Sequence, residues 1–391
     1  MGRRSSSGRF SRLVRDTFAV LLVLAALAAL SFALPIRTWR TGELPAPPLP
    51  LTPGGPPVER PARVWIDTDA ACGTGRTTDP DDCLALLLLA RSPGIRVVGV
   101  STVFGNAPLR VTDSVTRDLA RQVRREGLRV YRGAAAPATW ARSATDAQQA
   151  LRQALRTGPL TIVALGPLTN VVAALKDAPE LHRGVGRVVA VMGRRPGHLF
   201  HPAEGAGHGM LFGHGPVFRD FNFAQDPEGA GWLLESGLPV TLVPYDAARH
   251  VSLGAAELRE IARSSPAGAW VARRAGEWLD YWREDVGRAG FYPFDLVGAA
   301  WVVDPSRFDC ADVDGWVGPD RRLWGWLGSP EALMVGLPRE RADGMSAIGR
   351  VRYCPGLRPG FTAWLTRSLT SAGASSADRG ADAPRVSAPT E

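Results

Sequence analysis

The alternation of short apolar runs with helical patterns constrains the fold of this chain more than any other feature of its sequence. Runs rich in β-branched residues are followed by segments whose apolar residues recur at helical spacing. This alternation predicts an α/β fold with an open, mostly parallel sheet and helices on both faces. Ligands of such folds bind outside the carboxyl ends of the strands. We expect strands at 64–66, 95–103, 128–131, 160–165, 188–192 and 240–244, and helices around 84–89 and at 109–125, 144–156 and 168–176.

The N-terminal segment carries most of the net charge of the chain, which is +8. Residues 1–40 hold seven arginines and one aspartate, and an uncharged apolar run at 17–36 follows five of these arginines. A positive segment before about 20 apolar residues is typical of a signal peptide or a signal anchor. We therefore predict a membrane contact through residues 1–40, with the remainder exported or anchored outside the cytoplasm. Beyond residue 40 no basic stripe occurs, so no nucleic-acid partner is expected.

The rest of the chain divides into three segments by composition. Residues 41–62 are rich in proline and predict an extended linker, 63–370 predict one folded domain, and 371–391 predict a disordered tail. An extracytoplasmic domain can form disulfides. Of the four cysteines, we consider Cys310 and Cys354 a candidate pair because both lie in a late region with a strand-like pattern.

Two acidic clusters lie where chemistry is expected. Asp67 and Asp69 follow the first predicted strand, and Asp79, Asp81 and Asp82 open the helix that comes next. The second cluster has a structural explanation, because Asp79 suits a helix N-cap and the next two carboxylates complement the helix dipole. The first cluster has none, since carboxylates at one strand end repel each other unless a positive charge lies between them. Together the clusters indicate a hard cation bound by oxygen ligands, such as calcium or magnesium.

Polar motifs follow the later strands in one unbroken order. They are Thr102 to Asn106, Ala164 to Asn170, Phe221 to Phe223 followed by Asp226-Pro227-Glu228, and the stretch from Asp295 to Pro305. Together with the acidic clusters, this order resembles the inosine-uridine-preferring nucleoside hydrolase family over about residues 63–310. The resemblance implies an α/β fold with calcium at the centre of the site. It also implies hydrolysis of the N-glycosidic bond of ribonucleosides to ribose and free base.

The resemblance assigns roles to individual residues. The implied calcium ligands are the carboxylates of three aspartates and one backbone carbonyl, from Asp69, Asp82, Asp295 and Leu165. The implied contacts of the small-molecule nucleoside are Asp81, Asn106, Asp220, Asn222 and Phe294. Asp69 would also be the catalytic base that takes a proton from the attacking water, and Asp67 would support it from behind. Self-association into a homo-oligomer stays open.

Three departures from the family pattern bear on activity. Eight extra residues at 71–78 separate Asp69 from the Asp81-Asp82 pair, and Asp220 stands where the family usually has glutamate. Phe294 stands where many members have a histidine that protonates the leaving base. A phenyl ring cannot donate a proton, so another group must do so, or only substrates whose base departs easily are cleaved.

A histidine-rich loop offers candidates for that proton donor. Residues 193–217 contain His198, His201, His208 and His214, and the first two are favoured because the last two are flanked by glycine. The same loop could instead hold zinc or be a solvated loop without a catalytic role.

Two rival functions remain at this level. A haloacid-dehalogenase-type phosphatase also opens with an Asp-x-Asp motif, but it needs a downstream lysine, and the only lysine is Lys176, inside a predicted helix. A catalytically silent relative that binds a ribosylated ligand is the second rival.

Overall fold

A computed structural model describes residues 15–27, 46–55, 61–123, 128–137, 144–198, 220–319, 331–341 and 348–371. Within these residues, no helix is both long and apolar enough to cross a bilayer. Residues 15–27 form a helix with exposed apolar side chains, and most of the second half of the predicted anchor lies outside the described residues. The anchor or signal peptide therefore stays a prediction, as does the disordered tail, which lies outside the described residues from 372 onward.

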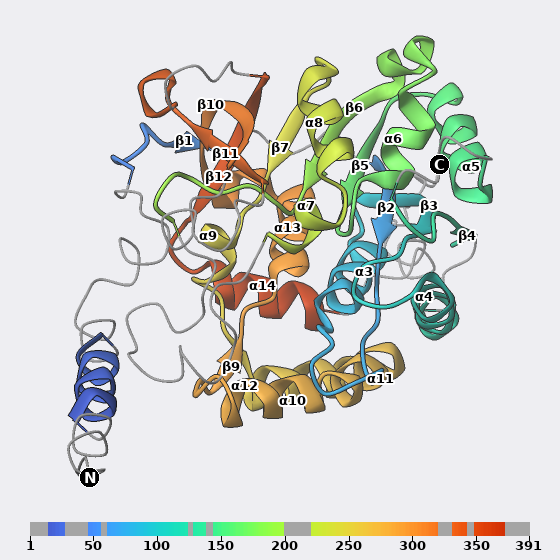
Figure 1. The fold of residues 1–391 in the computed structure, drawn as a ribbon. Helices are drawn as coiled ribbons and strands as arrows, with labels where there is room; N and C mark the ends of the chain where they lie inside the picture. Colours follow the sequence, from blue (N-terminus) through green and yellow to red (C-terminus); the bar gives the residue numbers. More distant parts are fainter. Residues whose placement is uncertain are drawn as a thin grey trace, which may run out of the picture.

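The core of the described domain is a mixed sheet of ten strands, seven of which are neighbours that run parallel (Figure 1). In spatial order the parallel strands are β4 (Val130–Arg132), β3 (Ile95–Thr102), β2 (Ala62–Thr68), β5 (Leu160–Ala164), β6 (Val185–Ala190), β7 (Val240–Leu242) and β12 (Gly349–Leu357). The antiparallel strands at the far edge are β10 (Phe308–Pro319), β1 (Thr52–Pro53) and β11 (Glu331–Gly336). The predicted α/β class and the six predicted parallel strands are confirmed.

Helices cover both faces of the sheet because successive side chains of each strand point to opposite faces. Val64 and Ile66 of β2 join one buried cluster, whereas Trp65 between them joins the other. The first face packs against α3 (Asp81–Arg91), α4 (Leu109–Val123), α13 (Phe294–Val303) and α14 (Phe361–Thr370). The second face packs against α5 (Asp146–Arg156), α6 (Thr169–Leu175) and α8 (Pro227–Glu235).

A further helical layer lies beyond the first face and was not foreseen from the sequence. It consists of α10 (Ala255–Ser264), α11 (Pro266–Arg274) and α12 (Gly276–Glu284), and Figure 1 shows it along the bottom of the view. These helices contact α3 and α14, and short strands β8 (Leu253–Gly254) and β9 (Gly290–Phe291) frame them. The layer closes one side of the space above the carboxyl ends of the strands.

The strand order places the site. Counted from β4 the order runs backward to β2 and then forward from β5 to β7, so the direction of winding changes between β2 and β5. A crevice forms at the carboxyl ends of the strands on either side of such a switch point. Asp67 and Thr68 end β2, so the first acidic cluster lies at this crevice.

Part of the predicted linker does not behave as a free spacer. β1 pairs with β10, the Thr52 hydroxyl donates to the carbonyl of Cys310, and the Ala46 amide donates to the carbonyl of Pro196. Residues 46–53 are therefore attached to the domain that they were expected to hold away from the membrane. Backbone hydrogen bonds to an otherwise unpaired strand edge account for this attachment.

The cysteines form two disulfides. The predicted bond between Cys310 and Cys354 is present and joins β10 to β12. A second bond joins Cys72 to Cys83 and closes the eight-residue insertion. The sequence did not indicate it, because the pairing depends on how the insertion folds back onto α3.

One close contact in the sheet gives a stability test. A Cβ atom added to Gly99 in β3 would lie 2.3 Å from the ring of Trp65, which is buried and stacked on Tyr131. We expect Gly99→Ala to lower the free energy of unfolding by about 1–3 kcal/mol, as overpacking does. Gly231→Ala in α8 is the matched control, because its Cβ would meet nothing within 4 Å. It should leave stability unchanged or raise it by up to about 1 kcal/mol; equal losses in urea denaturation would contradict the packing argument.

Candidate active site

Asp67 anchors the loops around the crevice. Its Oδ1 accepts hydrogen bonds from Ser101 Oγ (2.5 Å) and Asn170 Nδ2 (2.8 Å), and burial raises its pKa to about 7. Asn170 also donates to the carbonyl of Thr102 and accepts from the amide of Ala134. These bonds connect the ends of β2 and β3, the loop after β4 and the start of α6, so Asp67 lies behind the site, where the sequence analysis expected a supporting role.

Asp69 lies two residues further along, fully buried, and is held by one neighbour. The backbone amide of Asn106 donates to Oδ2 (2.8 Å) and its side-chain amide donates to Oδ1 (3.3 Å). Two glycines make room for the carboxylate. A Cβ on Gly105, which has φ +154°, would lie 1.8 Å from Asp69 Oδ2, and a Cβ on Gly166 would lie 3.1 Å from its Cγ. Burial and then the charge of Asp82 raise the pKa of Asp69 well above its usual value.

The second acidic cluster begins α3. Asp82 accepts hydrogen bonds from the Thr68 hydroxyl and from Asn106 Nδ2 (3.1 Å), and burial followed by the charge of Asp81 raises its pKa to about 7. Asp81 accepts from the backbone amides of Asp82 (3.0 Å) and Asp295 (2.8 Å). The hydrogen bond from the backbone amide of Asp295 joins α3 to the start of α13, and it brings a residue more than two hundred positions away into the site.

The expectation that Asp79 caps this helix is not met as stated. Helix α3 begins at Asp81, its N-cap residue is Pro80, and no side chain caps it. Asp79 Oδ1 accepts from the amide of Asp81 (3.1 Å), while the residue also lines the neighbouring cavity. Pro80 takes the N-cap position, so Asp79 lies one residue before it, with its side chain at the cavity.

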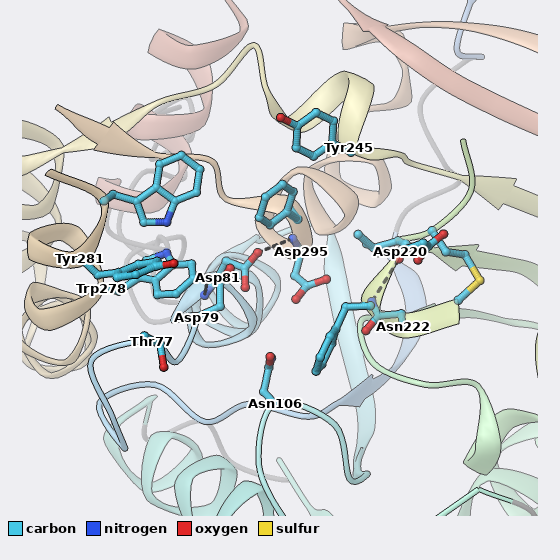
Figure 2. A pocket seen from close by; sticks show the side chains of 15 residues that line it. Thr77, Asp79, Asp81, Asn106, Asp220, Asn222, Tyr245, Trp278, Tyr281 and Asp295 are labelled. Atoms are coloured by element: carbon cyan, nitrogen blue, oxygen red, sulfur yellow. Dashed lines mark hydrogen bonds between the residues drawn. The ribbon is translucent and has the colours of Figure 1, made fainter. Parts of the chain in front are cut away.

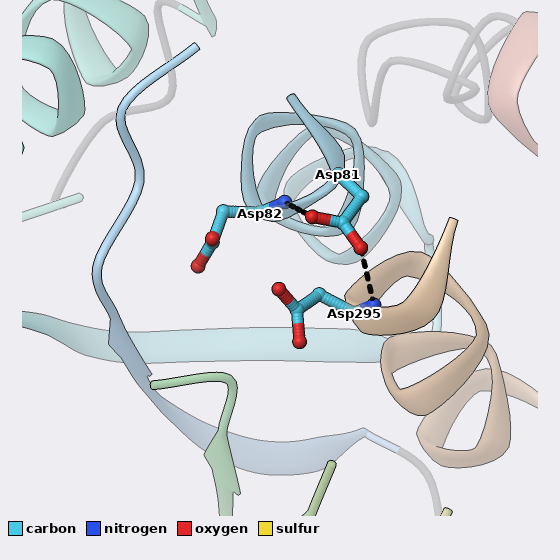
Figure 3. A group of neighbouring side chains, drawn as sticks. All are labelled: Asp81, Asp82 and Asp295. Carbon is cyan, nitrogen blue, oxygen red and sulfur yellow. Dashed lines mark hydrogen bonds between the residues drawn. The ribbon is translucent and has the colours of Figure 1, made fainter. Parts of the chain in front are cut away.

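Three carboxylates converge at the centre (Figure 3). Asp81, Asp82 and Asp295 each place an oxygen within 4.8 Å of the others, a spacing that suits a shared cation. Burial and then the charges of Asp81, Asp82 and Asp69 raise the pKa of Asp295 well above its usual value. Its Oδ1 is buried without a hydrogen-bond partner. Asp69 lies beside this trio rather than within it, although it was expected to be a ligand.

The predicted residues on the β5 side lie together as well. Asn222 Nδ2 donates to the carbonyls of Leu165 (2.7 Å) and Val191 (3.0 Å). A carbonyl oxygen has two lone pairs, so this bond leaves Leu165 able to accept a second partner. Asp220 is the N-cap of α7 (Phe221–Gln225) and accepts from the amides of Gly193 (2.6 Å) and Phe223 (3.2 Å). Burial raises the pKa of Asp220 to about 6 despite these two donors.

A cavity of about 330 Å³ connects these groups with an aromatic wall (Figure 2). Its polar side includes Asp81, Asn106, Asp220, Asn222 and Asp295. Its aromatic side chains are Phe221, Tyr245, Trp278, Tyr281, Trp282 and Phe294. Phe294 stacks on Tyr245 with ring centroids 5.8 Å apart. Every substrate-contacting residue implied by the resemblance therefore lines one cavity.

Most of the aromatic wall and the polar lining residue Thr77 were not foreseen from the sequence, and Asp79 was not expected at the cavity. Trp278 and Trp282 are four residues apart on α12, a spacing that indicates only a buried helix face. Nothing in that spacing distinguishes a wall of a binding cavity from a wall of the core.

His198, one of the two histidines favoured as the proton donor, lies against a carboxylate in this structure. His198 Nδ1 lies 2.6 Å from Asp246 Oδ2, which also accepts from the Tyr353 hydroxyl (3.0 Å). Although burial alone would raise it, the hydrogen bond from His198 lowers the pKa of Asp246. His198 is not among the described residues that line the cavity. His201, His208 and His214 lie outside the described residues, so the proton-donor and zinc predictions for that loop stay predictions.

Comparison with known proteins agrees with this arrangement. Residues 64–347 match the family model described as inosine-uridine preferring nucleoside hydrolase. The pyrimidine-specific ribonucleoside hydrolase RihA of Salmonella enteritidis is 26% identical over 271 residues, covering 62% of this chain and 81% of that protein. Its counterpart in an Enterobacter species is 27% identical over 269 residues, covering 61% and 80%.

Solved structures share the fold. A plant nucleoside hydrolase superposes with a TM-score of 0.63 at 21% identity, covering 80% of this chain and 99% of that one. A purine-preferring ribonucleoside hydrolase from Gardnerella vaginalis gives 0.60 at 18% identity, covering 79% and 98%. The family match spans most of the domain and includes the acidic clusters and the polar motifs that meet in the cavity. The chain therefore belongs to the inosine-uridine preferring nucleoside hydrolase family and is a nucleoside N-glycosyl hydrolase.

Proposed function

We propose that this protein hydrolyses ribonucleosides to ribose and free base with calcium held by Asp69, Asp82, Asp295 and the carbonyl of Leu165. The observation that carries the proposal is the convergence of buried carboxylates on one side of a cavity whose other side is aromatic. A nucleoside has the same two halves, a ribose rich in hydroxyls and a flat apolar base. The cavity volume of about 330 Å³ lies within the range of small-molecule sites.

The donor set fits a hard cation. All the candidate ligands are oxygens, which calcium and magnesium prefer. The buried Oδ1 of Asp295 has no hydrogen-bond partner, and burial and neighbouring carboxylates raise the pKa of Asp69 and Asp295. A bound cation offsets that repulsion and satisfies the unpaired oxygen. When bound, it also supplies the positive charge that makes a nearby water easier to deprotonate.

The chain's own residues supply the remaining steps. Asp69, oriented by two hydrogen bonds from Asn106, accepts the proton of the water that attacks the anomeric carbon. Asp81, Asn106 and Asn222 lie around the cavity where they bind ribose hydroxyls. The carboxylate of Asp81 also favours the positive charge that develops on the ribose ring in an oxocarbenium-like transition state.

The aromatic wall receives the base. Phe294 and Tyr245 form a stacked pair at the cavity, so a flat base can extend that stack. The departing base needs a proton unless it leaves easily, and His198 is engaged by Asp246 instead. The leaving group of an activated nitrophenyl riboside departs without a proton. A variant that lacks only the proton donor should therefore still cleave this substrate, whereas a variant with a damaged site should not.

Turnover tests this proposal against a silent relative. We expect the protein to release ribose from inosine or uridine and from the nitrophenyl riboside, and to stop when calcium is chelated. Binding of nucleosides without any release of ribose would favour the silent relative. The phosphatase rival is disfavoured further because Lys176 lies at the end of α6 and pairs with Glu228 (3.6 Å).

Substitutions of single carboxylates should have different effects. Asp82→Ala should abolish calcium binding, measured as metal per chain after dialysis, and activity with it. Asp69→Asn should lower kcat by about 10²–10⁴, the usual contribution of a general base. Asp280→Asn, at an exposed position of α12, is the control and should change neither. Full activity of the Asp82 variant without metal would contradict the assignment.

The crowded carboxylates also predict how pH affects the cation-free protein. Burial raises the pKa of Asp67 and of Asp82 to about 7, whereas an unfolded chain has values near 3.8. Between about pH 4 and 7 the folded state therefore holds protons that the unfolded state releases, so stability is lost as pH rises through this range. In chelator, we expect the melting temperature to fall by at least about 5 °C between pH 5 and 8.

Calcium should reduce that fall, because Asp82 is an assigned ligand and no longer needs a proton when calcium is bound, whereas Asp67 is not a ligand and keeps its contribution. Thermal scans at pH 5 and 8, each with chelator and with excess calcium, make the comparison. A calcium-independent pH profile would show that the carboxylates are not the groups responsible.

A further inference from the structure

The insertion between the two acidic clusters is a closed loop rather than a loose excursion. Cys72 and Cys83 are both fully buried and form a disulfide across 11 positions. Asp69 lies three residues before this bond, and Asp82 is the residue next to Cys83. The disulfide thus joins the two ends of the loop, and each end lies near a carboxylate that we assign to calcium.

The middle of the loop is fixed to the outer helical layer. Gly73 has φ +70°, and a Cβ there would lie 2.6 Å from Cγ of Arg274 at the end of α11. Arg76 donates to Glu284 (2.5 Å) at the end of α12 and pairs with Asp285 (2.6 Å) beyond it. Its guanidinium also lies 5.9 Å from the ring centroid of Tyr281, a cavity residue.

The loop therefore joins the two walls of the cavity. One wall, with Asp81 and Asp82, lies at the C-terminal end of the loop itself. The other wall, with Trp278 and Tyr281, belongs to α12, about two hundred residues later. Thr77 and Asp79 of the loop line the cavity between these walls, as Figure 2 shows.

We propose that the disulfide-closed loop 72–83 is a specificity-determining element, which holds the aromatic wall of α12 at a fixed position relative to the carboxylates. The proposal rests on the proposed function, because it assigns the two walls to base and ribose. A nucleoside bound by both walls gains only if their spacing matches the distance between its base and its ribose. Small errors in such positioning weaken binding and catalysis strongly.

This positioning role differs from a purely stabilising role in what it changes. If the loop fixes only the aromatic wall that receives the base, loss of the loop weakens the binding of whole nucleosides and reduces the discrimination between bases. Binding of ribose alone, which needs only the carboxylate wall, should persist. A loop that merely stabilises the domain would lower the melting temperature and leave the ratio of nucleoside to ribose affinity unchanged.

The first experiment removes each disulfide in turn from the full chain. In Cys72→Ala/Cys83→Ala we expect KM for inosine and uridine to rise about tenfold, with the inhibition constant of ribose changed less than about twofold. The matched control, Cys310→Ala/Cys354→Ala, removes an equally buried bond between β10 and β12 and should lower stability without changing KM. An unchanged KM in the first variant, or an equal loss of ribose affinity, would overturn the proposal.

A second variant keeps the disulfide in case its removal prevents folding. Arg76→Ala should raise KM for nucleosides about threefold, a modest effect because its ion pairs are partly exposed. Adding Glu284→Gln and Asp285→Asn to the Arg76→Ala variant should cause no further rise in KM. All three substitutions break the same contact between the loop and the end of α12. Arg283→Ala is the control, since Arg283 pairs with Asp280 on the same helix and does not contact the loop through that pair. Equal effects at positions 76 and 283 would also overturn the proposal.

Failure of the proposed function gives a different result. If the unmodified protein cleaves neither nucleosides nor the nitrophenyl riboside, hydrolysis is excluded. Calorimetric binding of inosine and of ribose to the same variants then tests the loop without turnover. The ratio of inosine affinity to ribose affinity should then fall in the loop variants and stay unchanged in the controls.

Discussion

Repulsion among buried carboxylates is the constraint on which the rest of this structure depends. Asp69, Asp81, Asp82 and Asp295 are all buried, and three of them place oxygens within 4.8 Å of one another. Such a cluster is unfavourable unless protons or a cation neutralise it. The surrounding structure holds the carboxylates in place with the amides of Asn106 and Asp295, the hydroxyl of Thr68 and the space left by two glycines. The switch between β2 and β5 supplies the crevice in which this arrangement fits.

Sequence reasoning predicted the sheet and the polar half of the site because both follow local rules. The strands are recognisable in the sequence as apolar runs. The residues after Thr68, Thr102 and Ala164 lie at one edge of the sheet because the carboxyl ends of parallel strands meet there. A helix was expected around 84–89, where the sequence is apolar on nearly every face, and Leu84 to Leu89 are fully buried. Asp295 entered the prediction through the resemblance alone, since nothing local relates α13 to α3.

The parts that were missed depend on contacts between distant segments. The aromatic wall of α12 has the pattern of any buried helix, and the disulfide between Cys72 and Cys83 forms only because the insertion folds back. Asp79 was interpreted as the N-cap of α3, but Pro80 takes that position and Asp79 lines the cavity. His198 was one of two favoured proton donors, and its ring contacts Asp246 of α9 (Tyr245–Ala248), which also accepts from the Tyr353 hydroxyl. For the aromatic wall, the disulfide and His198, a partner elsewhere in the chain decided between two local interpretations.

Proton release on calcium binding tests the central claim most directly. If the cation replaces protons on crowded carboxylates, calorimetric titration near pH 6.5 in buffers of different ionisation enthalpy should show at least about one proton released per calcium bound. Asp82→Ala should show neither the binding nor the release. Tight calcium binding with no proton release would mean that the carboxylates are already ionised without the cation. Their mutual repulsion would then not be what the bound ion relieves.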